Sequence, residues 1–244
     1  MNLQAHSQVG RRDLSGSLGS VAALFVILFN ADLLLVSSFG VELGIKPPFF
    51  PGPTAPADQV VSYFQTHTMP VLVSSFLQFG AAMTLGGFSA SVVRRLRVLG
   101  VRTAAPEVAL FGGLATAFNM SASAGVLWVI VYPDIVSNTS LIPAFHALSF
   151  VFGGPGFSVP MALLVAGVSI SAGSMKLLSK WVVRLGLAIA MVGALSWFSW
   201  LMVPLMIRGA VLFIPLTRFP AFVWLIAAGA QLSKRVPAAS TTAS

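Results

Sequence analysis

The chain has 244 residues, of which 57% are hydrophobic and 8% are charged, and its mean hydropathy is +0.91. This composition excludes an ordinary soluble domain, in which about 25% of residues are charged. Lys and Arg total 14 against 6 acids. Because these basic residues lie in short clusters between apolar runs, we expect membrane orientation and no nucleic-acid binding. The absence of cysteine excludes disulfides, thiolate metal sites and iron–sulfur clusters.

The apolar runs predict an all-α bundle of six transmembrane helices. A helix needs about 20 apolar residues to cross the hydrocarbon core. Five runs meet this length, at about Ser17–Gly40, Met69–Val92, Val108–Val131, Leu141–Ala172 and Trp181–Ile207. The sixth run, Arg208–Lys234, is ambiguous: Pro215 and Pro220 flank Arg218, and the stretch Phe219–Ser233 has only 15 residues. Either the span begins earlier and carries Arg218 into the outer leaflet, or a short broken helix enters the membrane.

The positions of Lys and Arg predict that both termini are cytoplasmic. With six spans, eleven of the 14 basic residues fall on the inner side and three on the outer side. The outer residues are Lys46, Arg208 and Arg218. The inner residues are Arg11, Arg12, Arg94, Arg95, Arg97, Arg102, Lys176, Lys180, Arg184, Lys234 and Arg235. An odd number of spans would place the last cluster on the wrong side.

These features divide the chain into a cytoplasmic tail at residues 1–16, a transmembrane domain at residues 17–233 and a disordered cytoplasmic tail at residues 234–244. The basic start of the first run also fits a secretory signal cleaved after about Ser38. Asn30 and Asp32 would interrupt the apolar part of such a signal, so a retained first span is favoured.

Asp32 is the clearest polar residue inside an apolar run. It lies about 12 Å from the outer end of its span, with Asn30 close by. A charge in the bilayer costs about 3 kcal/mol, so it calls for a partner or a function. Arg218 is the candidate partner. The alternative, which we favour, is that Arg218 snorkels to the outer surface.

Three further polar residues, Gln78, Asn119 and His146, are expected at depths of about 15, 20 and 6 Å from the outer side. Together with Asp32 they predict a polar layer in the outer half of the bundle. Interhelical hydrogen bonding is the favoured role for this layer, and a ligand site is the alternative.

The fourth run holds Gly153, Gly154, Pro155 and Gly156 near its middle. Proline removes a helical hydrogen bond, and glycine permits bending and close helix approach. A kink is therefore expected, and a discontinuous helix with exposed half-helix ends is the alternative. The glycine pairs Gly86–Gly87 and Gly112–Gly113 are candidates for close helix packing.

Ionisable groups are too few to favour an enzyme, and we expect no catalytic residue, metal or cofactor. His67 and His146 could ligate haem or a metal only with Asp32 or Asp134 added, and a zinc site needs three or four ligands.

Three segments, "YFQTHTMPVLVSSFLQFGAAMTLGGFSASVVRRLRVLG", "ALSFVFGGPGFSVPMALLVAGVS" and "LTRFPAFVWLIAAGAQL", resemble an uncharacterised group of bacterial multi-pass membrane proteins over about residues 57–233. The resemblance implies an inner-membrane protein. It supplies no functional residues, because the group has no assigned activity.

Three classes of function remain open from the sequence. The favoured class is a non-enzymatic accessory, regulatory or structural membrane protein, with the lipid bilayer and other membrane subunits as partners. The second is a small-solute or proton-coupled transporter or channel that uses the outer polar layer, with its small-molecule ligand unspecified. The third is a membrane enzyme or redox protein that uses the histidines.

Overall fold

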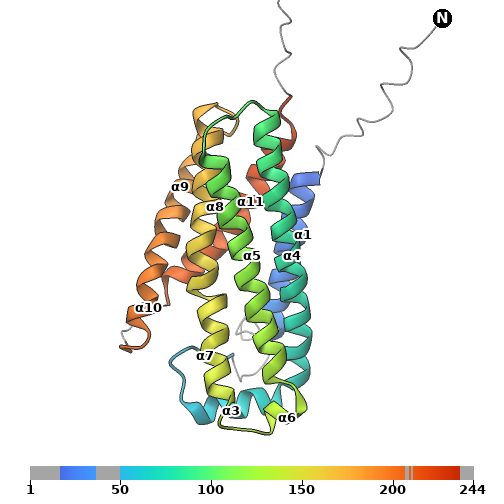
Figure 1. Cartoon of the computed structure of the whole chain (residues 1–244), viewed down its shortest axis with the longest axis vertical. Helices are drawn as coiled ribbons and strands as arrows, with labels where there is room; N and C mark the ends of the chain where they lie inside the picture. Colours follow the sequence, from blue (N-terminus) through green and yellow to red (C-terminus); the bar gives the residue numbers. More distant parts are fainter. Residues whose placement is uncertain (1–16, 37–49, 207–208, 210, 237–244) are drawn as a thin grey trace, which may run out of the picture.

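The computed structural model describes residues 17–36, 50–206, 209 and 211–236, and within these ranges its secondary structure is helical (Figure 1). Six segments are long and apolar enough to cross a membrane, which confirms the all-α, six-span prediction. Residues 1–16 and most of the predicted C-terminal tail lie outside the described residues, as does the possible cleavage position Ser38.

The first three spans are α1 (Ser17–Val36), α4 (Thr68–Val98) and α5 (Ala105–Ile130). The fourth consists of α7 (Ile142–Gly153) and α8 (Pro155–Ser174). The fifth consists of α9 (Lys180–Leu195), η2 (Ser196–Phe198) and α10 (Ser199–Met202), and the sixth is α11 (Phe213–Ser233). Two short helices, α3 (Ala57–Thr66) and α6 (Pro133–Val136), lie together at one end of the bundle (Figure 1).

The ambiguity in the sixth span is resolved in favour of an early start. The helix begins at Phe213 and includes Arg218, so the segment has 21 residues rather than 15. Pro215 lies in the first turn, where backbone N–H groups have no helical partner, so it does not disturb the helix. Pro220 is accommodated inside the helix without ending it.

The spans form a closed ring in which each helix packs against its two neighbours. The spatial order is α1, α4, α5, α8, α9 and α11, and α11 closes the ring against α1. Figure 1 shows that α1 begins and α11 ends at the same end of the bundle, and that α9, α10 and α11 stop short of the end that carries α3 and α6. We call the end where α1 begins and α11 ends the basic end, and the end that carries α3 and α6 the α3 end.

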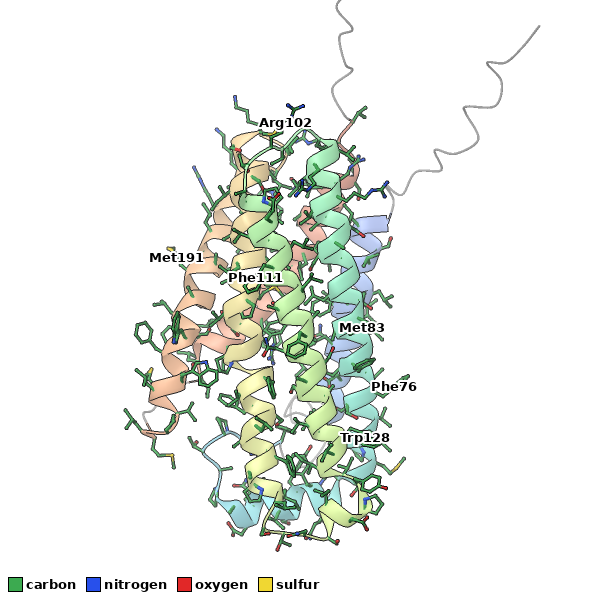
Figure 2. All side chains as sticks on the ribbon, viewed as in Figure 1. Phe76, Met83, Arg102, Phe111, Trp128 and Met191 are labelled. Carbon is green, nitrogen blue, oxygen red and sulfur yellow. The ribbon has the colours of Figure 1, made fainter. Side chains whose placement is uncertain are left out.

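Aromatic side chains fill the centre of the ring. Phe29 of α1 lies 5.3 Å from Phe222 of α11 and 5.9 Å from Phe157 of α8, measured between ring centroids. The outer surface is also apolar, as a bilayer requires: Phe76, Phe111 and Met191 are 76%, 66% and 67% exposed and project outward (Figure 2).

The helices α5 and α8 approach closely through glycine. A Cβ atom on Gly112 would lie 2.5 Å from both the Leu164 nitrogen and the Pro160 oxygen, so only glycine fits at this crossing. This confirms close packing for one predicted glycine pair. In the other pair, a Cβ on Gly86 would lie 3.6 Å from the Ala117 Cβ of α5, an ordinary contact, and a Cβ on Gly87 would meet nothing within 4 Å, so neither position requires glycine.

Basic side chains hold the basic end together. Arg95 of α4 donates hydrogen bonds to the backbone oxygens of Leu232 and Ser233 at 3.2 and 3.3 Å, and so caps the last turn of α11. Arg235 donates to the Leu177 oxygen at 2.8 Å, which fixes the connection between α8 and α9. These residues therefore stabilise the fold as well as providing the charge asymmetry.

Candidate functional site

The fourth span is interrupted at a single residue, Gly154. Since Pro155 has no N–H, the hydrogen-bond ladder cannot continue through it. The N–H groups of Phe157 and Ser158 both bond to the Gly154 oxygen, at 3.2 and 3.1 Å. In a continuous helix, Phe157 would instead donate to Gly153. The Gly153 carbonyl is therefore left without a helical partner, and the segment is two helices rather than the kinked single helix that we favoured.

Arg218 provides the missing partner. Its Nη2 donates a hydrogen bond to the Gly153 oxygen at 2.6 Å. Its guanidinium carbon lies 5.0 Å from the ring centroid of Phe29 and 4.9 Å from that of Phe157, which are cation–π distances. Arg218 thus points into the centre of the ring of helices and binds the interruption, whereas snorkelling would have placed the guanidinium at the surface.

The Asp32 side chain is buried, 4% exposed, and accepts a hydrogen bond from the Ser74 hydroxyl of α4. Asp32 and Arg218 lie close enough for their charges to attract each other. Among the described residues, however, no direct ion pair joins them. The two residues therefore share one charged region without the contact pair that the sequence suggested as an alternative to snorkelling.

Helix α5 approaches the interruption from the other side. A Cβ on Gly156 would lie 2.7 Å from the Val151 oxygen and 2.8 Å from Oδ1 of Asn119. The Asn119 Nδ2 donates to the Ala115 oxygen of its own helix at 2.8 Å. Ser123 Oγ donates to the Ser149 oxygen of α7 at 3.0 Å. Small residues at the interruption thus allow polar groups of α5 to contact it.

We call Asp32, Ser74, Arg218, Asn119 and the Gly153–Gly156 interruption the break site. It unites three of the predicted polar residues with the predicted glycine and proline cluster. Ser74, Phe29 and Phe157 were missed by the sequence analysis. Ser74 could have been found, because it stands one helical turn before Gln78 on α4, but the two phenylalanines carry no signal that separates them from other core aromatics.

The remaining members of the predicted polar layer lie apart from this site or contribute no bond to it. Asn30 Nδ2 bonds to the Val26 oxygen of its own helix at 2.7 Å. Gln78 is buried at 7% exposure, and its side chain has no hydrogen bond to another described residue.

His146 belongs to the α3 end, not to the break site. It is 4% exposed, and its Nε2 lies 3.0 Å from the Pro51 oxygen, so this nitrogen carries a proton and donates. The rings of Phe50 and Phe64 lie 5.7 and 5.8 Å away. His146 therefore anchors the segment before α3 to α7, and its side-chain hydrogen bond goes to this segment rather than to a residue of the break site.

The second histidine, His67, is also engaged locally. Its ring stacks on Tyr63 with centroids 4.6 Å apart. The Tyr63 hydroxyl donates to the Val36 oxygen at 3.0 Å, and burial raises the pKa of this phenol to about 12. Within the described part of the chain, no three His, Asp or Glu side chains are arranged to hold a metal ion.

A separate groove of about 470 Å³ lies between α4 and α5 on the outer surface of the bundle. Its lining is almost entirely apolar and includes Phe76, Phe79 and Trp128, and Figure 2 shows Phe76 and Trp128 on this exposed face. Neither Asp32 nor Arg218 contributes to it. The groove faces the region where lipid chains would lie.

The fold and the break site together define a multi-pass helical membrane protein with a charged region inside its bundle. Comparison of the sequence with family models and curated proteins, and of the chain with solved structures, gives no match. A functional assignment therefore depends on the chemistry of the break site alone.

Proposed function

We propose that this protein moves a small solute across the membrane in a process linked to protonation of Asp32. The observation that carries the proposal is that Arg218 bonds to the interruption of a membrane-spanning helix while the buried Asp32 lies close enough to attract its charge. Ionisable residues buried within membrane spans are costly and typically mark substrate or proton pathways. Discontinuous helices with binding groups at their ends are a recurring feature of transporters.

The charges of Asp32 and Arg218 suggest how protonation is linked to solute movement. Arg218 is attracted to the Asp32 carboxylate but is hydrogen-bonded to Gly153. Protonation of Asp32 removes its negative charge. The guanidinium of Arg218 then loses this attraction, so its present position beside Gly153 becomes more or less stable relative to other positions. Because Gly153 ends α7 and Pro155 begins α8, a change in Arg218 acts directly at the junction of two rigid helices.

The experiment uses the purified protein in liposomes that contain a pH-sensitive dye. Solutes of different classes, namely carboxylates, phosphate, amines and neutral sugars, are added outside, and proton entry is recorded. We expect one class to accelerate proton entry with the natural sequence but not with Asp32→Asn. Asp134→Asn is the matched control, because Asp134 is an exposed acid at the α3 end. Coupling that survives in Asp32→Asn would contradict the proposal, as would the absence of any active solute.

A second candidate function, a non-enzymatic accessory subunit, is favoured by the packing of Phe29 and Phe157 around Arg218. In this case the polar groups serve to hold the helices together. A stable co-purifying membrane partner, together with inert liposomes, would support it.

We also propose a bacterial inner-membrane location with both termini in the cytoplasm. The resemblance of residues 57–233 to bacterial multi-pass proteins supports the inner-membrane location. Support for the orientation comes from the clusters of Arg and Lys between spans, which in cytoplasmic loops set topology.

A further inference from the structure

The guanidinium of Arg218 has unused hydrogen-bonding capacity. It carries five N–H donors, and within the described part of the chain Nη2 is paired with Gly153. Its Nε is buried and has no partner among the described residues. A buried charged donor without an acceptor is strongly destabilising, so this arrangement suits an acceptor that arrives from outside the chain.

The neighbouring end of α8 favours the same kind of ligand. This helix has 20 residues and begins at Pro155, so the positive end of its dipole lies at the interruption, inside the bundle. On its first turns, Ser158 is fully buried, and its hydroxyl also lacks a hydrogen-bond partner in the described structure. A guanidinium, a helix N-terminus and an unpaired hydroxyl all attract an anion.

We propose that the break site binds a small carboxylate anion through Arg218, and that the Asp32 carboxylate competes with this anion for the guanidinium charge. A planar carboxylate matches the forked N–H groups of arginine. The rings of Phe29 and Phe157 lie close to the guanidinium, with centroids 5.0 and 4.9 Å from its carbon, so we assign a small ligand rather than a bulky one. This proposal rests on the proposed function, for which it names the substrate class.

Competition by Asp32 gives the site its pH dependence. Among the described residues, Arg218 is the charged group that acts on Asp32, and its guanidinium carbon lies 5.0 Å from the ring of Phe29, three residues before Asp32 on α1. The neighbouring faces of α4 and α5 supply the neutral residues Ser74, Gln78 and Asn119, and His146 of α7 is bonded to Pro51. The other described charges of α4 and α11 lie at the basic end, in their last turns and beyond. Binding of the anion is therefore expected to strengthen as Asp32 takes up a proton.

The test is binding of acetate to the purified protein in an uncharged detergent, followed through the shift of the thermal unfolding midpoint with acetate concentration. Sodium chloride and methylammonium chloride serve as the comparison ligands. Between pH 8 and pH 6, where acetate stays ionised, we expect its affinity for the natural protein to rise. Asp32→Asn should bind acetate about tenfold more tightly at pH 8 and lose the pH dependence, whereas Asp134→Asn should behave as the natural protein.

Arg218→Lys should weaken acetate binding by about tenfold, because lysine keeps the charge but not the fork. If Arg218→Lys does not fold, the acetate affinity of Asp32→Asn still tests whether Asp32 competes with the anion for Arg218. Unchanged acetate affinity in Asp32→Asn, or an equal shift with methylammonium, overturns the proposal. Acetate binding without solute-linked proton entry would support the anion site and contradict the transport function. Proton entry driven by a neutral solute, without acetate binding, would overturn the anion site alone.

Discussion

Arg218 of α11 donates a hydrogen bond of 2.6 Å to the backbone oxygen of Gly153, the last residue of α7. The bond replaces the one that Phe157 would donate to this oxygen in a continuous helix, because the Phe157 N–H bonds to Gly154 instead. It links the sixth span to the interruption of the fourth, and it explains how a carbonyl released inside the membrane is satisfied.

Replacing Arg218 with glutamine should destabilise the protein by about 2 kcal/mol, because the charge-assisted bond to Gly153 is lost. Thermal unfolding in detergent measures the effect. Arg184→Gln provides the control, since Arg184 is a residue near the basic end of α9 and away from the break site. Equal unfolding midpoints for the two variants would show that the bond between Arg218 and Gly153 does not contribute to stability.

The crossing of α5 and α8 should not accept a methyl group. Gly112→Ala places Cβ 2.5 Å from backbone atoms of α8, so we expect a loss of about 1–3 kcal/mol from forced separation of the helices. Gly87→Ala, where Cβ meets nothing within 4 Å, should be neutral or slightly stabilising. The unfolding midpoints of the two variants measure the difference. Equal midpoints for Gly112→Ala and Gly87→Ala would contradict the prediction.

Removal of the His146 ring should loosen the segment that precedes α3. His146→Ala loses the bond to the Pro51 oxygen and the contact with Phe50. We expect faster hydrogen exchange at the Ala55 amide, which bonds to the Gly52 oxygen at 3.0 Å in the same segment. In His67→Ala this amide should keep its natural exchange rate, and equal exchange in both variants would contradict an anchoring role for His146.

The α3 end should lose stability at alkaline pH through Tyr63. Burial favours the neutral phenol and raises its pKa to about 12, above the ordinary value of 10.0. The contribution of the neutral Tyr63 phenol to stability is therefore fully present below about pH 10 and is lost as the pH rises toward 12. The chain has two tyrosines, so the difference in phenolate absorbance between the natural protein and Tyr63→Phe isolates this group. A difference titration centred at pH 10 would contradict the shift.

The orientation of the bundle can be tested with single cysteines, because the natural chain has none. Arg102 is exposed at the basic end, as Figure 2 shows, and Asn138 is exposed beside α6. With cytoplasmic termini, an impermeant maleimide should label Asn138→Cys in intact cells and Arg102→Cys only after permeabilisation. The reverse pattern would invert the proposed topology.

The sequence by itself determined the number of spans, because the thickness of the bilayer sets how long an apolar helix must be. It also located the interruption at Gly153–Gly156, since the geometry of proline and glycine acts locally. Even the start of the sixth span depends on a local feature, the tolerance of the first helical turn for Pro215.

Only the tertiary structure decided which polar groups meet. Gly153 and Arg218 are 65 positions apart in the sequence, and their contact depends on the rotation of two helices about their axes, which apolar composition does not specify. His146 has the depth and polarity of a member of the charged region but bonds to Pro51, because α7 packs on α3 and α5 away from α1. In a bundle whose inner and outer surfaces are both apolar, packing rather than hydrophobic pattern sets each helix face.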